Sequence, residues 1–113
     1  MILHNTTFCI DEPFEKKLVD FVKETYMPAA YDCGMYNGLL TKIRAPRETN
    51  GLNGQSTVNY AIQFRAPSDE ICRRFSDEIM PAIFSGMNRD LQQALHVYCT
   101  ALDVIYDAEK NGE

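Results

Sequence analysis

Hydrophobic positions along the chain follow two spacings, one typical of strands and the other typical of helices. The stretch "STVNYAIQFRA" alternates strictly, so that Val58, Tyr60, Ile62 and Phe64 share one face and mostly polar residues share the other. Three further stretches rich in β-branched and apolar residues predict strands: "ILHNTTFCI", "GLLTKIRA" and "ALHVYCTALDVI". We therefore expect four strands.

Two segments between these strands have helical spacing and share a short pattern. Their apolar stripes are Phe14, Leu18, Phe21 and Val22 in the first, and Ile71, Phe75, Ile79 and Ile83 in the second. Each segment contains Met-Pro-Ala followed by Gly-Met, as "YMPAAYDCGM" and "IMPAIFSGM". A proline gives no N–H to the helix and a glycine ends a helix readily. We expect each helix to bend at its proline and to end within about two residues of Gly34 or Gly86.

The resulting order of elements, β-α-β-β-α-β, indicates an α+β fold of the ferredoxin-like type. Right-handed crossovers place both helices on one face of a four-stranded antiparallel sheet, with strand order 4-1-3-2. Asp11 and Ser68 are the expected N-caps of the two helices. We assign residues 1–106 to a single domain and 107–113 to a polar C-terminal tail. The stretch "PRETNGLNGQS", with two Asn-Gly pairs, should be a loop.

Composition and charge narrow the classes of partner. The chain has 113 residues, of which 45% are hydrophobic, and a net charge of -5. It has no apolar run near the roughly 20 residues that cross a bilayer, so we expect no membrane association. The scattered basic residues argue against nucleic-acid binding, which needs clustered Lys and Arg. The first residues lack the pattern of a secretory signal, so we expect a cytoplasmic protein.

Metal, cofactor and nucleophile motifs are not evident in the sequence. The two histidines, His4 and His96, lie on the first and last strands and should be far apart in an antiparallel pair. Four cysteines without a Cys-x-x-Cys pair indicate buried free thiols, and none can be paired with a histidine from spacing alone. We therefore predict no metal site, no cofactor and no catalytic constellation.

A group of polar-tipped side chains could line a pocket on the helix side of the sheet. We assign to that side, or to the kinked first helix, the candidates Tyr26, Tyr60, His4, His96 and Tyr98. Tyrosine combines an apolar ring with one hydroxyl, which suits a small aromatic or amphipathic ligand. The alternative is that these tyrosines are core residues whose hydroxyls bond to nearby polar groups.

The other face of the sheet has no helix to cover it. By alternation we assign to this face, as candidates for a homodimer interface, Leu3, Asn5, Asn59, Gln63, Leu95 and Val97. A self-complementary apolar patch of this kind suits a second copy of the chain. The alternative is a solvated face, which antiparallel sheets tolerate. The third strand offers this face no aromatic residue, which disfavours an RNA-recognition role.

Three stretches, "MILHNTTF", "FVKETYMPAAYDCGMY" and "VNYAIQF", resemble the short proteins grouped as domain of unknown function 4286. The resemblance covers nearly the whole chain and implies membership of the dimeric α/β-barrel group, which includes small monooxygenases, haem-degrading enzymes and isomerases. It implies a homodimer with pockets between sheet and helices. Related barrels often carry His-Leu-Pro or His-Ile-Pro where this chain has Tyr26-Met27-Pro28, so a role of that histidine does not transfer.

These observations favour a homodimeric module that binds a small ligand or a partner and has no evident catalytic constellation. The alternative is a cofactor-independent enzyme, similar to a monooxygenase or isomerase, that acts on a small aromatic substrate in a pocket between sheet and helices. A third hypothesis, an amino-acid-sensing regulatory domain, would normally need a second, effector domain, and the 113 residues leave no room for one.

Overall fold

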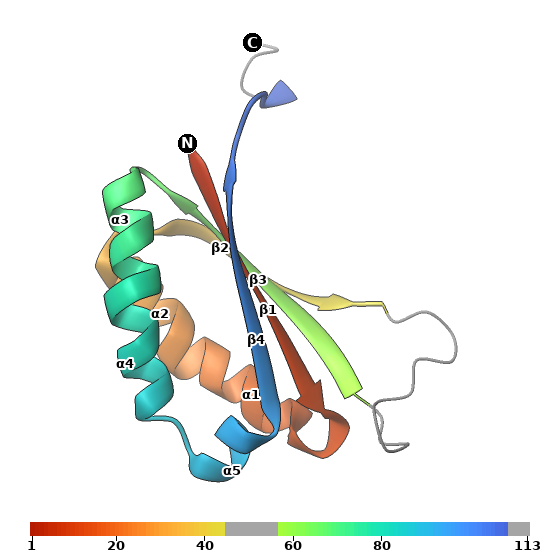
Figure 1. The fold of residues 1–113 in the computed structure, drawn as a ribbon. Helices are drawn as coiled ribbons and strands as arrows, with labels where there is room; N and C mark the ends of the chain where they lie inside the picture. Colours follow the sequence, from red (N-terminus) through yellow and green to blue (C-terminus); the bar gives the residue numbers. More distant parts are fainter. Residues whose placement is uncertain (45–56, 109–113) are drawn as a thin grey trace.

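The computed structural model describes residues 1–44 and 57–108, and it has the expected ferredoxin-like architecture (Figure 1). The strands form one antiparallel sheet in the order β2-β3-β1-β4, which confirms the predicted order. Their bounds are β1 Ile2–Asp11, β2 Tyr36–Ile43, β3 Thr57–Ala66 and β4 Leu95–Asp103. The predicted Asn-Gly loop lies outside the described residues.

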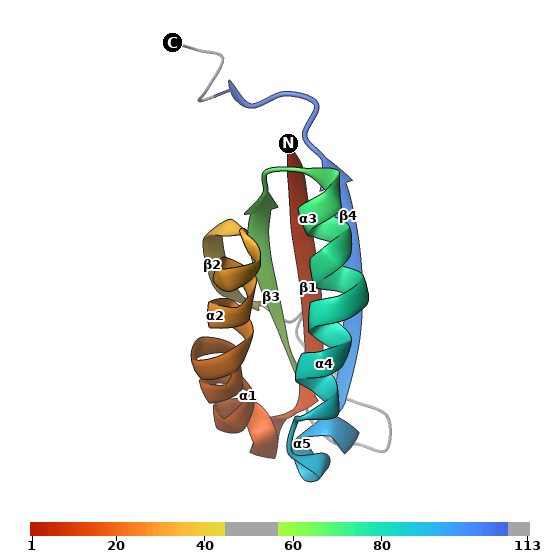
Figure 2. The same ribbon diagram turned by 90° about the vertical axis from the view of Figure 1, so that its left-hand side faces the viewer.

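Two long helical segments lie side by side on one face of the sheet (Figure 2). The first consists of α1 (Glu15–Phe21), a π-helical turn (Val22–Tyr26) and α2 (Met27–Cys33). The second consists of α3 (Asp69–Arg74), a π-helical turn (Phe75–Ile79) and α4 (Met80–Ser85). A 3-10 turn, Glu12–Phe14, precedes the first, and the short helix α5 (Arg89–Gln93) leads into β4.

Each helical segment continues through its proline, as predicted, and widens just before it. The N–H of Met27 bonds to the carbonyl of Val22, and the N–H of Met80 bonds to that of Phe75, five residues back in each case. A proline ring normally clashes with the carbonyl four residues before it. In both segments, the carbonyl four residues before the proline lies in the wider π-helical turn, and such turns are common sites of helix distortion. The sequence pattern predicted that each helix continues through its proline, but it did not predict the π-helical turns.

The helix ends agree with the sequence more closely than the helix starts. The caps after α2 and α4 are Gly34 and Gly86, as expected. Ser68 caps α3 through its hydroxyl, which accepts from the N–H of Ile71 at 3.2 Å. Asp11, the other expected N-cap, occupies the N-cap position of the 3-10 turn that opens the first helical segment, but its side chain makes no capping bond. The helix α5 was missed, although Asn88 caps it and was a usable signal.

The pairing register decides which face each strand residue occupies. His4, Thr6, Phe8 and Ile10 of β1 are buried, on the face of the sheet that the helices cover. Phe8 lies directly opposite Val97, and Ile10 lies opposite Leu95, and directly paired residues share a face. Leu95 and Val97 are therefore on the helix side, and our assignment of both to the open face was wrong.

The same register places the alternate residues of β4, His96 and Tyr98, on the open face. His96 lies opposite Cys9 and Tyr98 lies opposite Thr7, and these partners belong to the open face. Our placement of His96 and Tyr98 on the helix side was therefore also wrong. The physical cause is the pairing register: each even-numbered residue of β1 lies opposite an odd-numbered residue of β4. Alternation within one strand does not reveal which of its two faces pairs with the buried face of its neighbour. In contrast, Leu3, Asn5, Asn59 and Gln63 occupy the open face as predicted.

The segment after β4 continues past the end of the sheet and keeps two contacts with it. The N–H of Val104 donates to the carbonyl of Met1 at 3.1 Å. The guanidinium of Arg65 on β3 lies 3.5 Å from the carboxylate of Asp107. The first contact extends the pairing of β1 with β4 by one step, and the second ties Asp107, the first residue of the predicted tail, to β3. Within residues 1–44 and 57–108, no helix has the length and apolar character needed to cross a membrane.

The two capping glycines provide a matched pair of substitutions. Gly34 has a left-handed φ of 111°, and a Cβ there would lie 3.1 Å from the Ile71 side chain. Gly86 has a φ of -90°, and an added Cβ would meet nothing closer than 3.7 Å. We expect Gly34→Ala to lower the free energy of unfolding by about 1–2 kcal/mol. Gly86→Ala should raise it by about 0.4–1 kcal/mol. Urea denaturation measures both, and equal effects would contradict this account of the caps.

Candidate functional site

Tyr26, the first candidate for a ligand pocket, is a core residue. Its side chain has no exposed surface, and its ring makes edge contacts with Phe8 and Phe75 at centroid distances of 5.4 Å. Its hydroxyl lies 2.7 Å from the Thr6 hydroxyl and also approaches the Met80 sulfur. Burial raises the pKa of the Tyr26 phenol far above its usual value. This packing offers no surface to a ligand, so the expected pocket at Tyr26 is contradicted.

Tyr60 is held in a polar network at the β2 side of the sheet. Its hydroxyl donates to the carboxylate of Glu15, which also binds the Lys42 ammonium at 2.7 Å. Burial, together with the Glu15 carboxylate as an acceptor, raises the pKa of Tyr60 to about 12. The hydrogen bonds from Lys42 and Tyr60 lower the pKa of Glu15. The network links α1, β2 and β3, and gives Tyr60 a structural partner.

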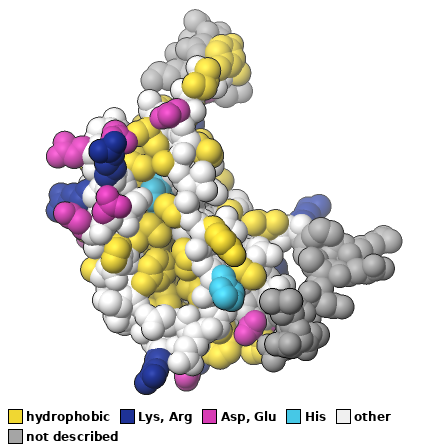
Figure 3. All heavy atoms as spheres, in the orientation of Figure 1, with side chains coloured by type: hydrophobic (Ala, Val, Ile, Leu, Met, Phe, Trp, Pro, Cys, Tyr) yellow, Lys and Arg dark blue, Asp and Glu magenta, His cyan; other side chains and the backbone are white. Residues whose placement is uncertain are grey.

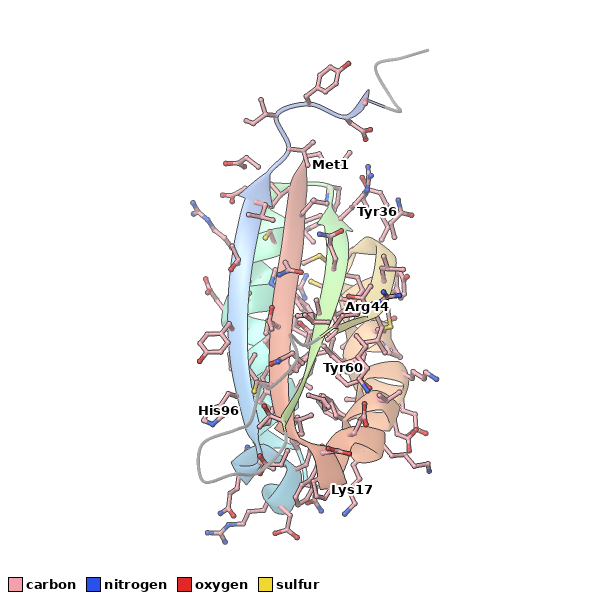
Figure 4. All side chains as sticks on the ribbon, turned by 90° about the vertical axis from the view of Figure 1, so that its right-hand side faces the viewer. Met1, Lys17, Tyr36, Arg44, Tyr60 and His96 are labelled. Carbon is pink, nitrogen blue, oxygen red and sulfur yellow. The ribbon has the colours of Figure 1, made fainter. Side chains whose placement is uncertain are left out.

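The five predicted pocket residues do not converge. Tyr26, Tyr60 and His4 lie on the helix side, whereas His96 and Tyr98 lie on the open face. Figure 4 looks onto that face and shows His96 projecting at the lower end of β4. A metal shared between His4 and His96 has no geometric basis, because the two rings belong to opposite faces. Within the described ranges, no three His, Cys, Asp or Glu side chains gather as a metal site requires.

The structure instead brings together three polar side chains that the sequence analysis did not combine. Cys99 Sγ lies 3.1 Å from His4 Nε2, and Ser76 Oγ lies 2.9 Å from the same nitrogen. Ser76 Oγ and Cys99 Sγ are 3.9 Å apart. We call these three residues the thiol–imidazole cluster. It was missed because the alternation that put Leu95 and Val97 on the open face put Cys99, two residues further along β4, on that face as well.

The imidazole of this cluster is buried and the thiol is exposed. His4 has no exposed surface and packs edge-on against the ring of Phe75 at 5.2 Å. Burial lowers the pKa of His4, so its ring is neutral at neutral pH. His4 Nδ1 has no hydrogen-bond partner within the described part of the chain. Cys99, on the edge strand β4, is exposed to solvent. The cluster therefore has a buried imidazole in contact with a cysteine that is exposed to solvent.

An apolar surface continues from the cluster along β4. Figure 3 shows hydrophobic side chains gathered between the helix layer and β4, where the helices leave the edge strand partly uncovered. On the helix side of this surface are Ile79 and Ile83, which follow Ser76 at helical spacing. On the strand side are Leu95 and Val97, which precede Cys99 on the same face of β4. These four side chains are half-buried and pack against the core. We call this surface the β4 groove.

The open face has apolar side chains at both edges and amides in the middle. Leu39 and Ile43 lie on β2, and Tyr98 and Leu102 lie on β4, all of them exposed. Between these edges, β1 and β3 contribute Asn5, Thr7, Asn59, Ala61 and Gln63, which are half-buried. The two surfaces that the chain leaves uncovered, the β4 groove and the open face, are therefore on opposite sides of the sheet.

Comparison with known families matches residues 1–105 to the model described as Domain of unknown function (DUF4286). The chain belongs to this family. The match spans the sheet and both helical segments, which confirms the resemblance seen in the sequence. No curated protein matches the chain. The DUF4286 fold is nevertheless well represented among solved structures.

Three solved structures illustrate this likeness. A Bacillus cereus protein provisionally described as an antibiotic biosynthesis monooxygenase has a TM-score of 0.59 at 13% identity, covering 94% of both chains. A Bacillus halodurans protein of the ethyl tert-butyl ether D (EthD) family has a TM-score of 0.57 at 11% identity, over 88% of this chain and 97% of that one. A dimeric ferredoxin-like protein from an uncultured marine organism has a TM-score of 0.50 at 15% identity, over 93% and 96%. At these identities the likeness shows the fold alone.

Proposed function

We propose that this DUF4286 protein is a homodimeric module that associates through the open face of its sheet and binds a small amphipathic ligand in the β4 groove. The observation that carries the proposal is the pair of apolar surfaces that the chain leaves uncovered on opposite sides of the sheet. Self-association through one of them leaves the other accessible. The dimeric ferredoxin-like neighbour supports this arrangement by analogy of fold.

The open face has the composition of an interface between copies. Leu39 is 57% exposed and Tyr98 is 66% exposed, at opposite edges of the sheet. Side chains of this size left in water favour association. The half-buried amides of Asn5, Asn59 and Gln63 between them can exchange hydrogen bonds across an interface. One face of a four-stranded sheet can supply about 800 Å² per partner, the area of a standard interface.

A twofold axis parallel to the strands makes the two edges complementary. Such an axis places β2 of one copy over β4 of the other and preserves the level along the strands. Leu39 is at the level of Thr100, because Leu39 pairs with Gln63, Gln63 pairs with Asn5, and Asn5 pairs with Thr100. Leu39 of one copy then lies over the β4 edge of the second copy, between its two exposed apolar side chains.

The β4 groove suits a small ligand with an apolar body. Its walls are aliphatic, and its one polar end is the thiol–imidazole cluster. Small-molecule sites typically combine an apolar lining with a few convergent polar groups. The occupant that fits is therefore an aromatic or amphipathic molecule with one hydrogen-bonding group, placed near His4 and Cys99.

A fluorescent probe tests the ligand site. Anilinonaphthalene sulfonate should bind the unmodified protein, and Val97→Trp should weaken that binding by about tenfold or more because the indole fills the groove. Tyr98→Trp, one residue along β4 but on the opposite face, should leave the probe affinity unchanged. Fluorescence titration measures both, with urea denaturation to verify folding. Equal affinity for all three folded proteins would refute the groove as the ligand site.

The enzymatic alternative has weaker support. The likeness to the Bacillus cereus protein extends to the fold alone. Tyr26, Tyr60, His96 and Tyr98, which were expected to line a substrate pocket, are divided between a packed core and the open face. The binding module is therefore the function that the geometry supports best.

A further inference from the structure

The thiol–imidazole cluster has the geometry of a nucleophile beside a proton acceptor. Cys99 comes from β4, His4 from β1, and Ser76 from the π-helical turn of the second helical segment. The 3.1 Å between Cys99 Sγ and His4 Nε2 is within the reach that pairs a nucleophile with its base. Cys99 lies on the edge strand β4 and is exposed, so a reagent can reach its thiol.

Burial keeps the His4 ring neutral, so a nitrogen lone pair is free to face the thiol. A neutral imidazole has one N–H and one nitrogen lone pair. In the tautomer with the proton on Nδ1, the Nε2 lone pair faces the Cys99 thiol and the Ser76 hydroxyl. Among the side chains of residues 1–44 and 57–108, Cys99 and Ser76 are within hydrogen-bond distance of the ring, both at Nε2, and Nδ1 has no side-chain partner. The hydroxyl of Ser76 can donate to the sulfur after the thiol proton has left.

We propose that Cys99 is a reactive thiol, with His4 as its proton acceptor, which exchanges with the disulfide of a small thiol such as oxidised glutathione. The Cys99 sulfur attacks one sulfur of that disulfide while its proton passes to His4 Nε2. The S–S bond breaks, a mixed disulfide forms on Cys99, and the released thiolate takes the proton from His4. This exchange needs only a thiol, a proton acceptor and access, and the cluster supplies all three.

The other cysteines lack one or more of these features. Cys72 is buried, and burial raises the pKa of its thiol. Cys33 is half-buried and its thiol points to the backbone carbonyl of Ile71 at 3.9 Å. Cys9 is half-buried on the open face, which a second copy would cover under the proposed function. Cys99 faces the helix side, so its reactivity does not depend on whether the dimer forms.

The test is a time course of modification by oxidised glutathione, followed by mass spectrometry of the peptides. An exposed thiol without a neighbouring imidazole serves as the reference, introduced by Ser85→Cys on the exposed residue at the end of α4. Cys99 should react about tenfold or more faster than this reference, because a positioned acceptor accelerates proton removal. Equal rates would overturn the proposal, since exposure alone would then account for the reactivity.

A second variant separates the acceptor from accessibility. His4→Gln should reduce the rate at Cys99 to that of the Ser85→Cys reference while the rate at Cys33 stays unchanged. Buried Cys72 reports folding, because unfolding would expose it to the reagent. If His4→Gln leaves Cys72 protected and the Cys99 rate unaltered, His4 is not the acceptor. If His4→Gln unfolds, the test is the comparison between the rates of Cys99 and the reference thiol in the Ser85→Cys protein, which retains His4.

Discussion

Replacing Tyr26 with alanine should lower the free energy of unfolding by about 3–5 kcal/mol, the range for removing a large buried aromatic side chain. The ring is enclosed by Phe8, Phe64, Phe75 and Phe84. Its loss therefore leaves a cavity in the centre of the helix-side core. Tyr26→Phe removes only the hydroxyl bonded to Thr6 and should cost about 1–3 kcal/mol. Urea denaturation at neutral pH measures both.

Tyr106→Ala is the matched control for the Tyr26 series. Tyr106 is 70% exposed, so truncating it should change the free energy of unfolding by no more than about 0.5 kcal/mol. A ligand-pocket role for Tyr26 predicts the opposite pattern, with little effect on stability and a large effect on binding. If Tyr26→Ala is as stable as Tyr106→Ala, Tyr26 is not the core residue described here.

Ala61→Arg should dissociate the homodimer. Ala61 is on β3 in the middle of the open face, directly opposite Thr7 of β1. Because Ala61 lies near the proposed twofold axis, the two introduced guanidinium groups would be close neighbours within the interface, and like charges brought together there cost several kcal/mol. We expect the dimer dissociation constant to rise by at least about a hundredfold, which corresponds to roughly 3 kcal/mol. Sedimentation velocity over a range of concentrations measures this change.

The same substitution at Ala82 is the control. Ala82 is exposed on α4, away from the sheet, so Ala82→Arg adds the same charge without touching the open face. It should leave the dissociation constant unaltered. Dissociation caused equally by both variants would point to net charge, and dissociation caused by Ala82→Arg alone would place the interface on the helix layer.

The sequence was most informative where one face of an element is fully buried. In β3, Tyr60, Ile62 and Phe64 are buried in strict alternation, and that alternation is directly readable from the chain. The positive φ of Gly34 likewise follows from a residue type that tolerates it. The π-helical turns before Pro28 and Pro81 were not predictable, because their hydrogen bonds depend on how the proline ring is accommodated in three dimensions.

The edge strand β4 shows where the sequence is insufficient. Leu95 and Val97 alternate with His96 and Tyr98, and either face of the sheet could receive the apolar set. Only the pairing of Phe8 with Val97 decides between them, and this register depends on contacts distant in the sequence. Because of the error in β4, the residues expected to line one pocket lie on two different faces of the sheet. The same error also concealed the contact between His4 and Cys99, which lie 95 residues apart.

The measurement that tests the central claim most directly is the mass of the unmodified protein in solution at micromolar concentration, determined by light scattering. The chain mass is 12.9 kDa. Association through the open face predicts a particle of twice that mass, since the exposed apolar edges on β2 and β4 are then covered by a second copy. A particle of 12.9 kDa at that concentration would contradict the homodimer and leave the open face solvated.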